Sequence, residues 1–263
     1  MMRLQANVLL FLRIPIFFHW SFTKCEMEGI FRFKEFNVDQ TGCGMKVNTD
    51  GVLLGALTGE GTPGTILDIG AGTGVIALML AQRFAEACID AIEIDTDAAV
   101  TALSNFKNSP FSERLRLHQG SFQEYMGGNL PVQYDLIVSN PPFFITSLVN
   151  NDHKKKTARH TDTSFFSDLT LLSAGNLSPS GNISLILPVS TAETVEKLAI
   201  KQGLSVHDEI EIKSFSNSNP HRKIITFGFT SKIKTHRSFV IYQQEKQYSL
   251  EYQRALKDFF IIF

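Results

Sequence analysis

The strongest constraint on the fold is a short apolar segment followed at once by closely spaced glycines. Residues 65–69 read Thr-Ile-Leu-Asp-Ile, and residues 70–74 read Gly-Ala-Gly-Thr-Gly. The first segment favours a buried β-strand, and residues 75–83 continue with apolar positions at helical spacing. A strand, a glycine turn and a helix in this order are typical of a nucleotide-binding α/β unit. The sequence therefore predicts a parallel sheet with a ligand at the carboxyl end of this strand.

The spacing of the glycines indicates which kinds of ligand this turn can bind. It is G-x-G-x-G, and not the G-x-G-x-x-G that cradles a pyrophosphate. Gly70, Gly72 and Gly74 would let the backbone pass close beneath a ligand, and Asp68 can accept a hydrogen bond from a ligand ammonium. The spacing therefore disfavours a nicotinamide dinucleotide.

A second predicted strand, residues 89–94, places an acid 23 positions after Gly70. This is close to the offset of about 20 residues at which an acid grips ribose hydroxyls. We assign that role to Glu93. Asp95 is the alternative, but it is better suited to capping a helix over residues 96–108.

The third predicted strand, residues 115–119, leads to Ser121 and Phe122. This strand end would lie beside the base of a bound nucleoside. An acid is common there, and Ser121 stands in its place. We expect both residues near the cofactor base.

The fourth predicted strand, residues 134–139, stops at Asn140-Pro141-Pro142-Phe143. Prolines cannot donate to a sheet ladder and they fix the turn, so the Asn140 amide and the Pro141 carbonyl point in a set direction. Two rigid acceptors suit a planar amine, such as the exocyclic amine of a nucleobase, with Phe143 stacked on its ring. A plain strand-ending turn explains the tetrapeptide about as well when it is considered alone.

Two basic segments are candidates for binding a polyanion. Residues 212–244 contain no acid, and residues 150–163 form a polar segment beside the proposed site. We predict that the second segment is a substrate-contacting loop that orders on binding. A solvated face and a plain exposed loop are the alternatives. The cations and the histidine on which this prediction depends are Arg222 and Lys223 in the first segment and Lys154, Lys155, Lys156, Arg159 and His160 in the second.

Residues 1–26 differ from the rest of the chain. Their apolar run is interrupted by Arg13 and Pro15, is too short to span a bilayer and has no small-residue cleavage site. We interpret this segment as extraneous or disordered, followed by a single domain over residues 27–263. The 3 cysteines have no metal-ligand spacing, which indicates free thiols in a reducing cytoplasm and no metal site.

The later segments complete the predicted elements. Thr49 or Asp50 can cap a helix that ends near Leu57. We further predict helices over 164–177, 191–202 and 248–263, a strand over 183–187, and an antiparallel pair over 204–212 and 224–230.

The residues at these strand ends resemble a known group. Residues 68–74, Glu93 and residues 140–143 resemble the class I S-adenosylmethionine-dependent amino-methyltransferases. Residues 46–55, 158–160 and 248–263 are similar to the bacterial tRNA (adenine-N6) methyltransferases, which modify adenine 37 beside the anticodon of tRNA-valine. The resemblance runs from about residue 27 to the end, and it departs from the family at Ser121.

The resemblance implies a Rossmann-like α/β fold, with helices on both faces of a seven-stranded, mostly parallel sheet whose last two strands are antiparallel. It implies S-adenosyl-L-methionine as the cofactor, with its methionyl part on Asp68 and the glycine turn and its ribose on Glu93. Thr49 and Asp50 would cover it from the N-terminal side. The implied reaction is methylation of the N6 amine of adenine in tRNA, with Asn140, Pro141 and Phe143 as catalytic residues and Pro142 beside the substrate.

Four other functions fit parts of the sequence. The same tetrapeptide serves methyltransferases of guanine N2 in ribosomal RNA and of glutamine side chains in proteins. A nicotinamide oxidoreductase and a non-catalytic RNA-binding module are further alternatives. We expect a monomeric cytoplasmic enzyme that binds tRNA, with no membrane contact and no obligate protein partner.

Overall fold

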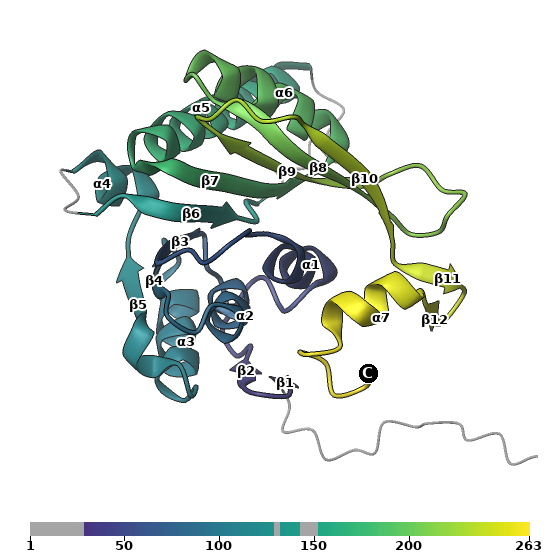
Figure 1. The fold of residues 1–263 in the computed structure, drawn as a ribbon. Coiled ribbons are helices and arrows are strands. Elements are labelled where there is room, and N and C mark those ends of the chain that lie inside the picture. The colour runs from purple at the N-terminus through teal and green to yellow at the C-terminus, as the bar shows by residue number, and fades with distance from the viewer. Residues whose placement is uncertain (1–28, 129–131, 143–151) are drawn as a thin grey trace, which may run out of the picture.

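The computed structural model describes residues 29–128, 132–142 and 152–263, and only the backbone of residues 152–162. An eight-stranded sheet, in the order β10-β8-β9-β7-β6-β3-β4-β5, forms the centre of the molecule (Figure 1). Its strands are β3 (Thr65–Ile69), β4 (Cys88–Glu93), β5 (Leu115–Gln119), β6 (Tyr134–Ser139), β7 (Leu177–Leu187), β8 (Ser205–Lys213), β9 (Arg222–Gly228) and β10 (Thr235–Val240). Two small antiparallel pairs lie outside it, namely β1 (Ile30–Arg32) with β2 (Asn37–Asp39), and β11 (Tyr242–Gln244) with β12 (Gln247–Tyr248).

Seven helices cover the two faces of this sheet in the described residues (Figure 1). They are α1 (Thr49–Leu57), α2 (Val75–Arg83), α3 (Thr96–Lys107), α4 (Phe122–Gly127), α5 (Asp152–Gly175), α6 (Val189–Lys201) and α7 (Leu250–Leu256), with a short 3-10 turn at Ser112–Arg114. Leu53 of α1, Leu78 of α2, Phe106 of α3 and Leu256 of α7 belong to one hydrophobic core, and α4, α5 and α6 contribute to a second. Each core is formed on one face because helices that cross between parallel strands must bury an apolar stripe against the sheet.

The strand directions confirm the predicted fold class, with one more strand than expected. Neighbours from β5 through β7 run parallel, and β9 runs antiparallel to both β7 and β8. The additional strand is β10, which pairs parallel with β8 at the edge. Its first four residues are exposed and polar, so no apolar alternation marks it in the sequence.

The predicted loop over residues 150–163 is wrong from residue 152 onward. Residues 152–163 form the first half of α5, which continues to Gly175. This stretch has no glycine or proline before residue 175 and contains good helix formers, but it has no apolar stripe from which a helix is recognised.

Two helix ends also differ from the prediction. The cap of α1 is Asn48, whose side chain accepts a hydrogen bond from the Gly51 N–H at 2.9 Å, and not Thr49 or Asp50. The C-terminal helix ends at Leu256, and the chain continues in turns that bury Phe259 and Phe260. None of the described helices is long and apolar enough to cross a membrane.

Candidate active site

The carboxyl ends of three adjacent strands meet at one edge of the sheet. Ile69 of β3 is paired in register with Ser139 of β6 and with Ile92 of β4. The Ser139 hydroxyl also donates to the Ile69 carbonyl at 2.7 Å, which ties the two strand ends together. The residues that follow in register are Gly70, Asn140 and Glu93. Since neighbouring strands lie about 4.8 Å apart, the structure brings these three predicted site residues together.

The glycine turn has one side that faces open space. Gly70, Gly72 and Gly74 have φ angles of 76°, 55° and 80°, in the left-handed region that favours glycine. Among the described atoms, a Cβ at Gly70 or Gly72 would meet nothing within 4 Å, whereas one at Gly74 would lie 2.5 Å from the Phe106 ring. The first two positions therefore leave room for a ligand, and Gly74 allows α3 to pack against the turn.

Asp68 is fully buried at the end of β3 and has one occupied and one free oxygen. Its Oδ2 accepts a hydrogen bond from the Ala77 N–H at 3.2 Å. Because Gly74 cannot cap α2 with a side chain, this carboxylate takes the place of the cap. The other oxygen, Oδ1, is buried without a hydrogen-bond partner in the described part of the chain. Burial raises the pKa of Asp68 to about 7.

Glu93 holds the backbone around the site. Its Oε2 accepts from the Gly72 N–H and its Oε1 accepts from the Asp95 N–H, both at 2.8 Å. Each carboxylate oxygen keeps a further lone pair that a ribose hydroxyl can use. Asp95 accepts from the Ala98 N–H at 2.9 Å, which confirms it as the cap of α3.

Asn140 carries a second buried acceptor without a partner. The residue is 9% exposed, and its Oδ1 has no hydrogen bond from any described residue. An unpaired buried amide oxygen costs about 1–3 kcal/mol, so such groups usually have a partner in the functional state. Pro141 is buried and Pro142 is exposed, whereas Phe143 lies outside the described residues.

Ser121 and Phe122, which the sequence predicts near the cofactor base, contact other residues of the protein. Ser121 caps α4 by accepting from the Glu124 N–H at 3.2 Å. Phe122 is 7% exposed, and its ring meets Phe165 edge-on at 5.4 Å. Ile94, which follows Glu93, is 71% exposed. The sequence analysis did not consider Ile94, although this exposed apolar side chain directly follows the predicted ribose acid.

The start of α1 lies beside the glycine turn. A Cβ at Gly51 would be 3.7 Å from Val75 and Ile76, the first two residues of α2. Thr49 and Asp50 begin the same helix turn. The Asp50 carboxylate accepts from Nε of Arg222 at 2.8 Å, which ties α1 to the first residue of β9.

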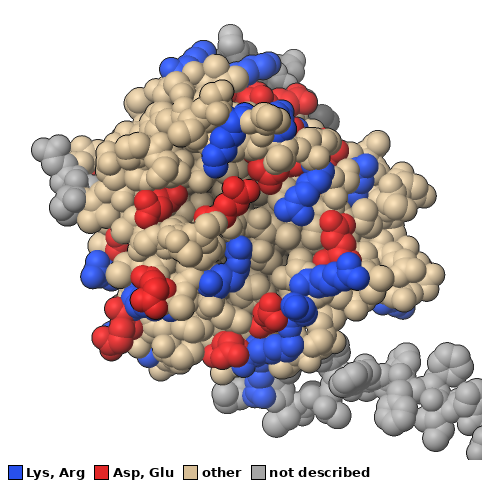
Figure 2. All heavy atoms as spheres, viewed as in Figure 1, with Lys and Arg blue, Asp and Glu red and all other residues tan. Residues whose placement is uncertain are grey.

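The cations of residues 212–244 are partly neutralised by acids from elsewhere in the chain. Lys223 is 9% exposed, and its ammonium lies 3.2 Å from Oε1 of Glu209. Lys234 lies 3.0 Å from the other oxygen of Glu209. On the face that Figure 2 shows, Lys and Arg are interspersed with Asp and Glu. Five further residues were predicted to bind the polyanion, but their side chains are not among those that the structure describes. They are Lys154, Lys155, Lys156, Arg159 and His160.

Comparison with known proteins agrees with this geometry. The model of the methyltransferase small domain family matches residues 48–183. A protein of Pedobacter heparinus named tRNA1(Val) (adenine(37)-N6)-methyltransferase is 46% identical over 238 residues, which cover 90% of this chain and 100% of the relative. A protein of the same name from Parabacteroides distasonis is 44% identical over 232 residues, covering 88% and 97%.

Solved structures share the fold at low sequence identity. A predicted O-methyltransferase from Agrobacterium tumefaciens matches with a TM-score of 0.60 and 16% identity, over 80% of this chain and 96% of that one. A glycopeptide N-methyltransferase complexed with S-adenosylmethionine matches with a TM-score of 0.50 and 14% identity, over 70% and 100%. The sheet order, the strand-end residues and the full-length relatives lead to one conclusion: the chain belongs to the tRNA1(Val) (adenine(37)-N6)-methyltransferase family.

Proposed function

We propose that this protein transfers a methyl group from S-adenosyl-L-methionine to the N6 amine of adenine in tRNA, at the position in tRNA-valine that its relatives' name states. One observation carries the proposal. Asp68 Oδ1 and Asn140 Oδ1 are buried acceptors without a described partner, at the ends of adjacent strands. Such a pair needs ligands that donate, and the cofactor carries an ammonium while adenine carries an amine.

The residues at the sheet edge fit the cofactor. The open side of Gly70 and Gly72 leaves room for its methionyl part beside Asp68. Glu93 retains lone pairs for the ribose hydroxyls. When bound, S-adenosyl-L-methionine supplies an electrophilic methyl group. The remaining expected contacts are Thr49, Asp50 and Gly74 around the methionyl part, and Ser121 and Phe122 near the base. To these we add the exposed Ile94.

Asn140 and Pro141 would activate the acceptor amine. The nitrogen of adenine N6 is a poor nucleophile because its lone pair is conjugated into the ring. Hydrogen bonds to Asn140 Oδ1 and the Pro141 carbonyl favour a more tetrahedral nitrogen and stabilise the positive charge that develops on it. Most of the acceleration would come from positioning, with Phe143 holding the ring.

The RNA would approach over the same edge. A base in an anticodon loop is single-stranded, so moving it into a pocket costs less than opening a duplex. We propose that the enzyme acts as a monomer in the cytoplasm. The residues expected to contact RNA are Pro142, Lys154, Lys155, Lys156, Arg159, His160, Arg222 and Lys223, although the buried pairing of Lys223 with Glu209 leaves that ammonium little surface.

The test is methyl transfer to defined acceptors. Purified protein would be incubated with methyl-labelled cofactor and tRNA from a strain that lacks the gene, and the nucleosides would be analysed by mass spectrometry. We expect N6-methyladenosine in tRNA-valine, and no label in ribosomal RNA or release factors. Label in guanine N2 or in protein glutamine would identify one of the alternative acceptors. Cofactor binding without any single-turnover transfer would contradict an enzymatic function.

A further inference from the structure

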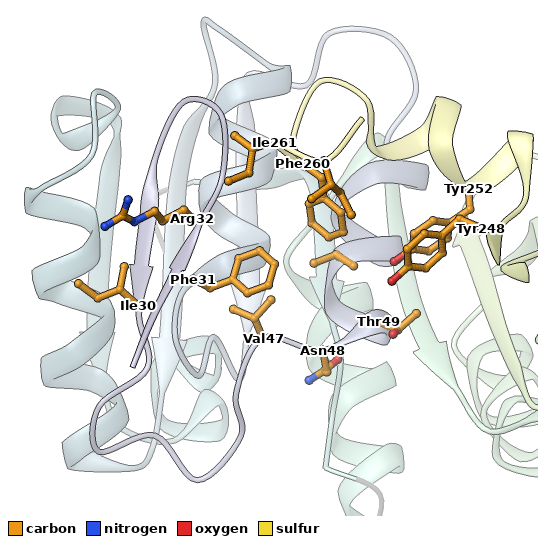
Figure 3. A pocket seen from close by; sticks show the side chains of 12 residues that line it. Ile30, Phe31, Arg32, Val47, Asn48, Thr49, Tyr248, Tyr252, Phe260 and Ile261 are labelled. Carbon is orange, nitrogen blue, oxygen red and sulfur yellow. The ribbon is translucent and has the colours of Figure 1, made fainter. Parts of the chain in front are cut away.

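A cavity of about 470 Å³ lies between the N-terminal hairpin, the start of α1 and the C-terminal segment (Figure 3). Aromatic rings from separate parts of the chain line it, namely Phe31 of β1, Tyr248 of β12, Tyr252 of α7 and Phe260. Its volume falls within the range of about 300–1,000 Å³ that is usual for small-ligand sites. The cavity is therefore large enough for a planar ring.

Two phenol hydroxyls give this apolar cavity a polar side. The rings of Tyr248 and Tyr252 stack at 4.7 Å with 10° between their planes, and Figure 3 shows their hydroxyls pointing in the same direction. Neither hydroxyl has a hydrogen-bond partner among the described residues, although Tyr252 is only 3% exposed. Burial raises the pKa of Tyr252, so its hydroxyl stays protonated and can both donate and accept.

This combination selects the chemistry of the occupant. An aliphatic side chain or lipid chain would fill the volume, but it would cover the Tyr248 and Tyr252 hydroxyls without offering them a hydrogen bond, which is unfavourable. A nucleobase offers a flat face for the aromatic rings and an edge with donors and acceptors for the hydroxyls. The shape and the polarity of the cavity together favour a base.

The position of the cavity relates it to the candidate active site. Thr49, the first residue of α1, lines the cavity. Gly51, in the same helix turn, packs against the first residues of α2 directly after the glycine turn. The first turn of α1 therefore contributes to the cavity and also contacts the helix that follows the glycine turn.

We propose that this cavity binds a second nucleobase of the RNA substrate, from a nucleotide adjacent to the methylated adenine. The proposal rests on the proposed function, because it takes the substrate to be single-stranded RNA. The second base would orient the RNA strand, while Asn140 and Pro141 hold the target base.

The experiment uses the full chain, S-adenosylhomocysteine and an anticodon stem-loop RNA with 2-aminopurine at either position next to the target. We expect the fluorescence to be quenched on binding at one of the two positions, and less quenched with the Phe31→Ala variant. The affinity for RNA should fall about 10-fold in Phe31→Ala, since stacking on one aromatic ring typically contributes this much. Tyr242→Phe is the matched control, because Tyr242 stacks on Tyr248 at 5.3 Å but does not line the cavity.

A double-mutant cycle uses an RNA with an abasic nucleotide at the position where 2-aminopurine fluorescence is quenched. Removing the base should weaken binding to the wild-type chain and cost nothing further in Phe31→Ala. Tyr248→Phe should reduce discrimination between bases while leaving the affinity for the abasic RNA unchanged. If Phe31→Ala also loses affinity for S-adenosylhomocysteine, Tyr248→Phe is the variant that tests whether the cavity binds a base. No quenching at either position, or an equal cost of base removal in wild type and variants, would overturn the proposal. These readouts measure binding alone, so they are independent of whether methyl transfer to tRNA succeeds.

Discussion

Nε of Arg222 donates to the Asp50 carboxylate at 2.8 Å, joining two residues that are 172 positions apart in the chain. The side chains are 27% and 18% exposed, so water screens the pair less than it screens a surface pair. The contact fixes the first turn of α1 against the start of β9. Since this turn adjoins the glycine turn, the pair connects the C-terminal strands to the expected cofactor site.

We predict that Arg222→Met weakens binding of S-adenosylhomocysteine about 5-fold, because loss of such a pair costs about 1 kcal/mol. Isothermal titration calorimetry would measure it. Asp50→Asn should have a similar effect, and the double variant should lose little more. If only RNA affinity falls, Arg222 acts on the RNA and not through α1.

Replacing Asn140 with alanine should separate catalysis from cofactor binding. The Asn140 side chain oxygen makes no hydrogen bond within the described protein, so its loss should leave the melting temperature and the affinity for S-adenosylhomocysteine nearly unchanged. The turnover rate should fall at least 100-fold, as for loss of a group that acts on developing charge. Parallel losses of turnover and cofactor affinity would instead show that Asn140 is structural.

The raised pKa of Asp68 predicts that the affinity for the cofactor depends on pH. Its pKa of about 7 lies above the ordinary value, so the folded, ligand-free protein keeps this proton to a higher pH than the unfolded chain does. Its contribution to stability is therefore complete below about pH 4 and is lost as the pH rises through 7. An ammonium ligand needs the carboxylate, so the affinity for S-adenosylhomocysteine should rise between pH 6 and 8 with release of up to one proton. Calorimetry in buffers of different ionisation enthalpy would measure this release, and Asp68→Asn should abolish it.

The two glycines at positions 72 and 74 should respond differently to alanine. In Gly74→Ala the new Cβ meets the buried Phe106 ring at 2.5 Å, so we expect a loss of about 2–4 kcal/mol in the free energy of unfolding. In Gly72→Ala only the left-handed backbone is strained, at a cost of about 1–2 kcal/mol. That variant should mainly lose cofactor affinity. Denaturant unfolding and calorimetry on both variants would compare them, and equal destabilisation would contradict the difference in packing.

Reversing the charges of Lys154, Lys155 and Lys156 to glutamate should weaken RNA binding and flatten its dependence on salt. Each lost phosphate contact reduces the logarithmic salt slope by about 0.7–0.9. Filter binding between low and moderate salt would measure the slope. Lys107→Glu, at an exposed position of α3, shows the effect of one charge reversal outside this segment, and Lys154→Glu alone is its match in net charge. An unchanged slope would remove this part of α5 from the RNA interface.

The sequence was sufficient to predict the positions of Asp68, Glu93 and Asn140, because each lies at or directly after the end of an apolar strand that glycine, proline or an acid marks. The ends of parallel strands meet at one edge regardless of what the helices between them contain. For this reason the arrangement of the strand ends was predictable even where helix boundaries, such as the start of α5, were not.

The charge pattern of the sequence does not record the ion pairs that form between distant segments. Residues 212–244 have no acid of their own, yet Lys223 and Lys234 share Glu209 of β8. The pairing of β8 with β9 brings Lys223 close to Glu209, and Lys234 directly precedes β10, which pairs with β8 on its other side. No local sequence pattern records these pairings. The polar strand β10 was missed for the related reason that an exposed edge needs no apolar residues.

That edge also affects how molecules of this protein meet one another. A strand with an unpaired side can add a strand from another molecule, and charged or polar side chains oppose such growth. On β10 the exposed residues are Thr235, His236, Arg237 and Ser238. In concentrated solutions of the protein, sheets should therefore resist edge-to-edge association through β10.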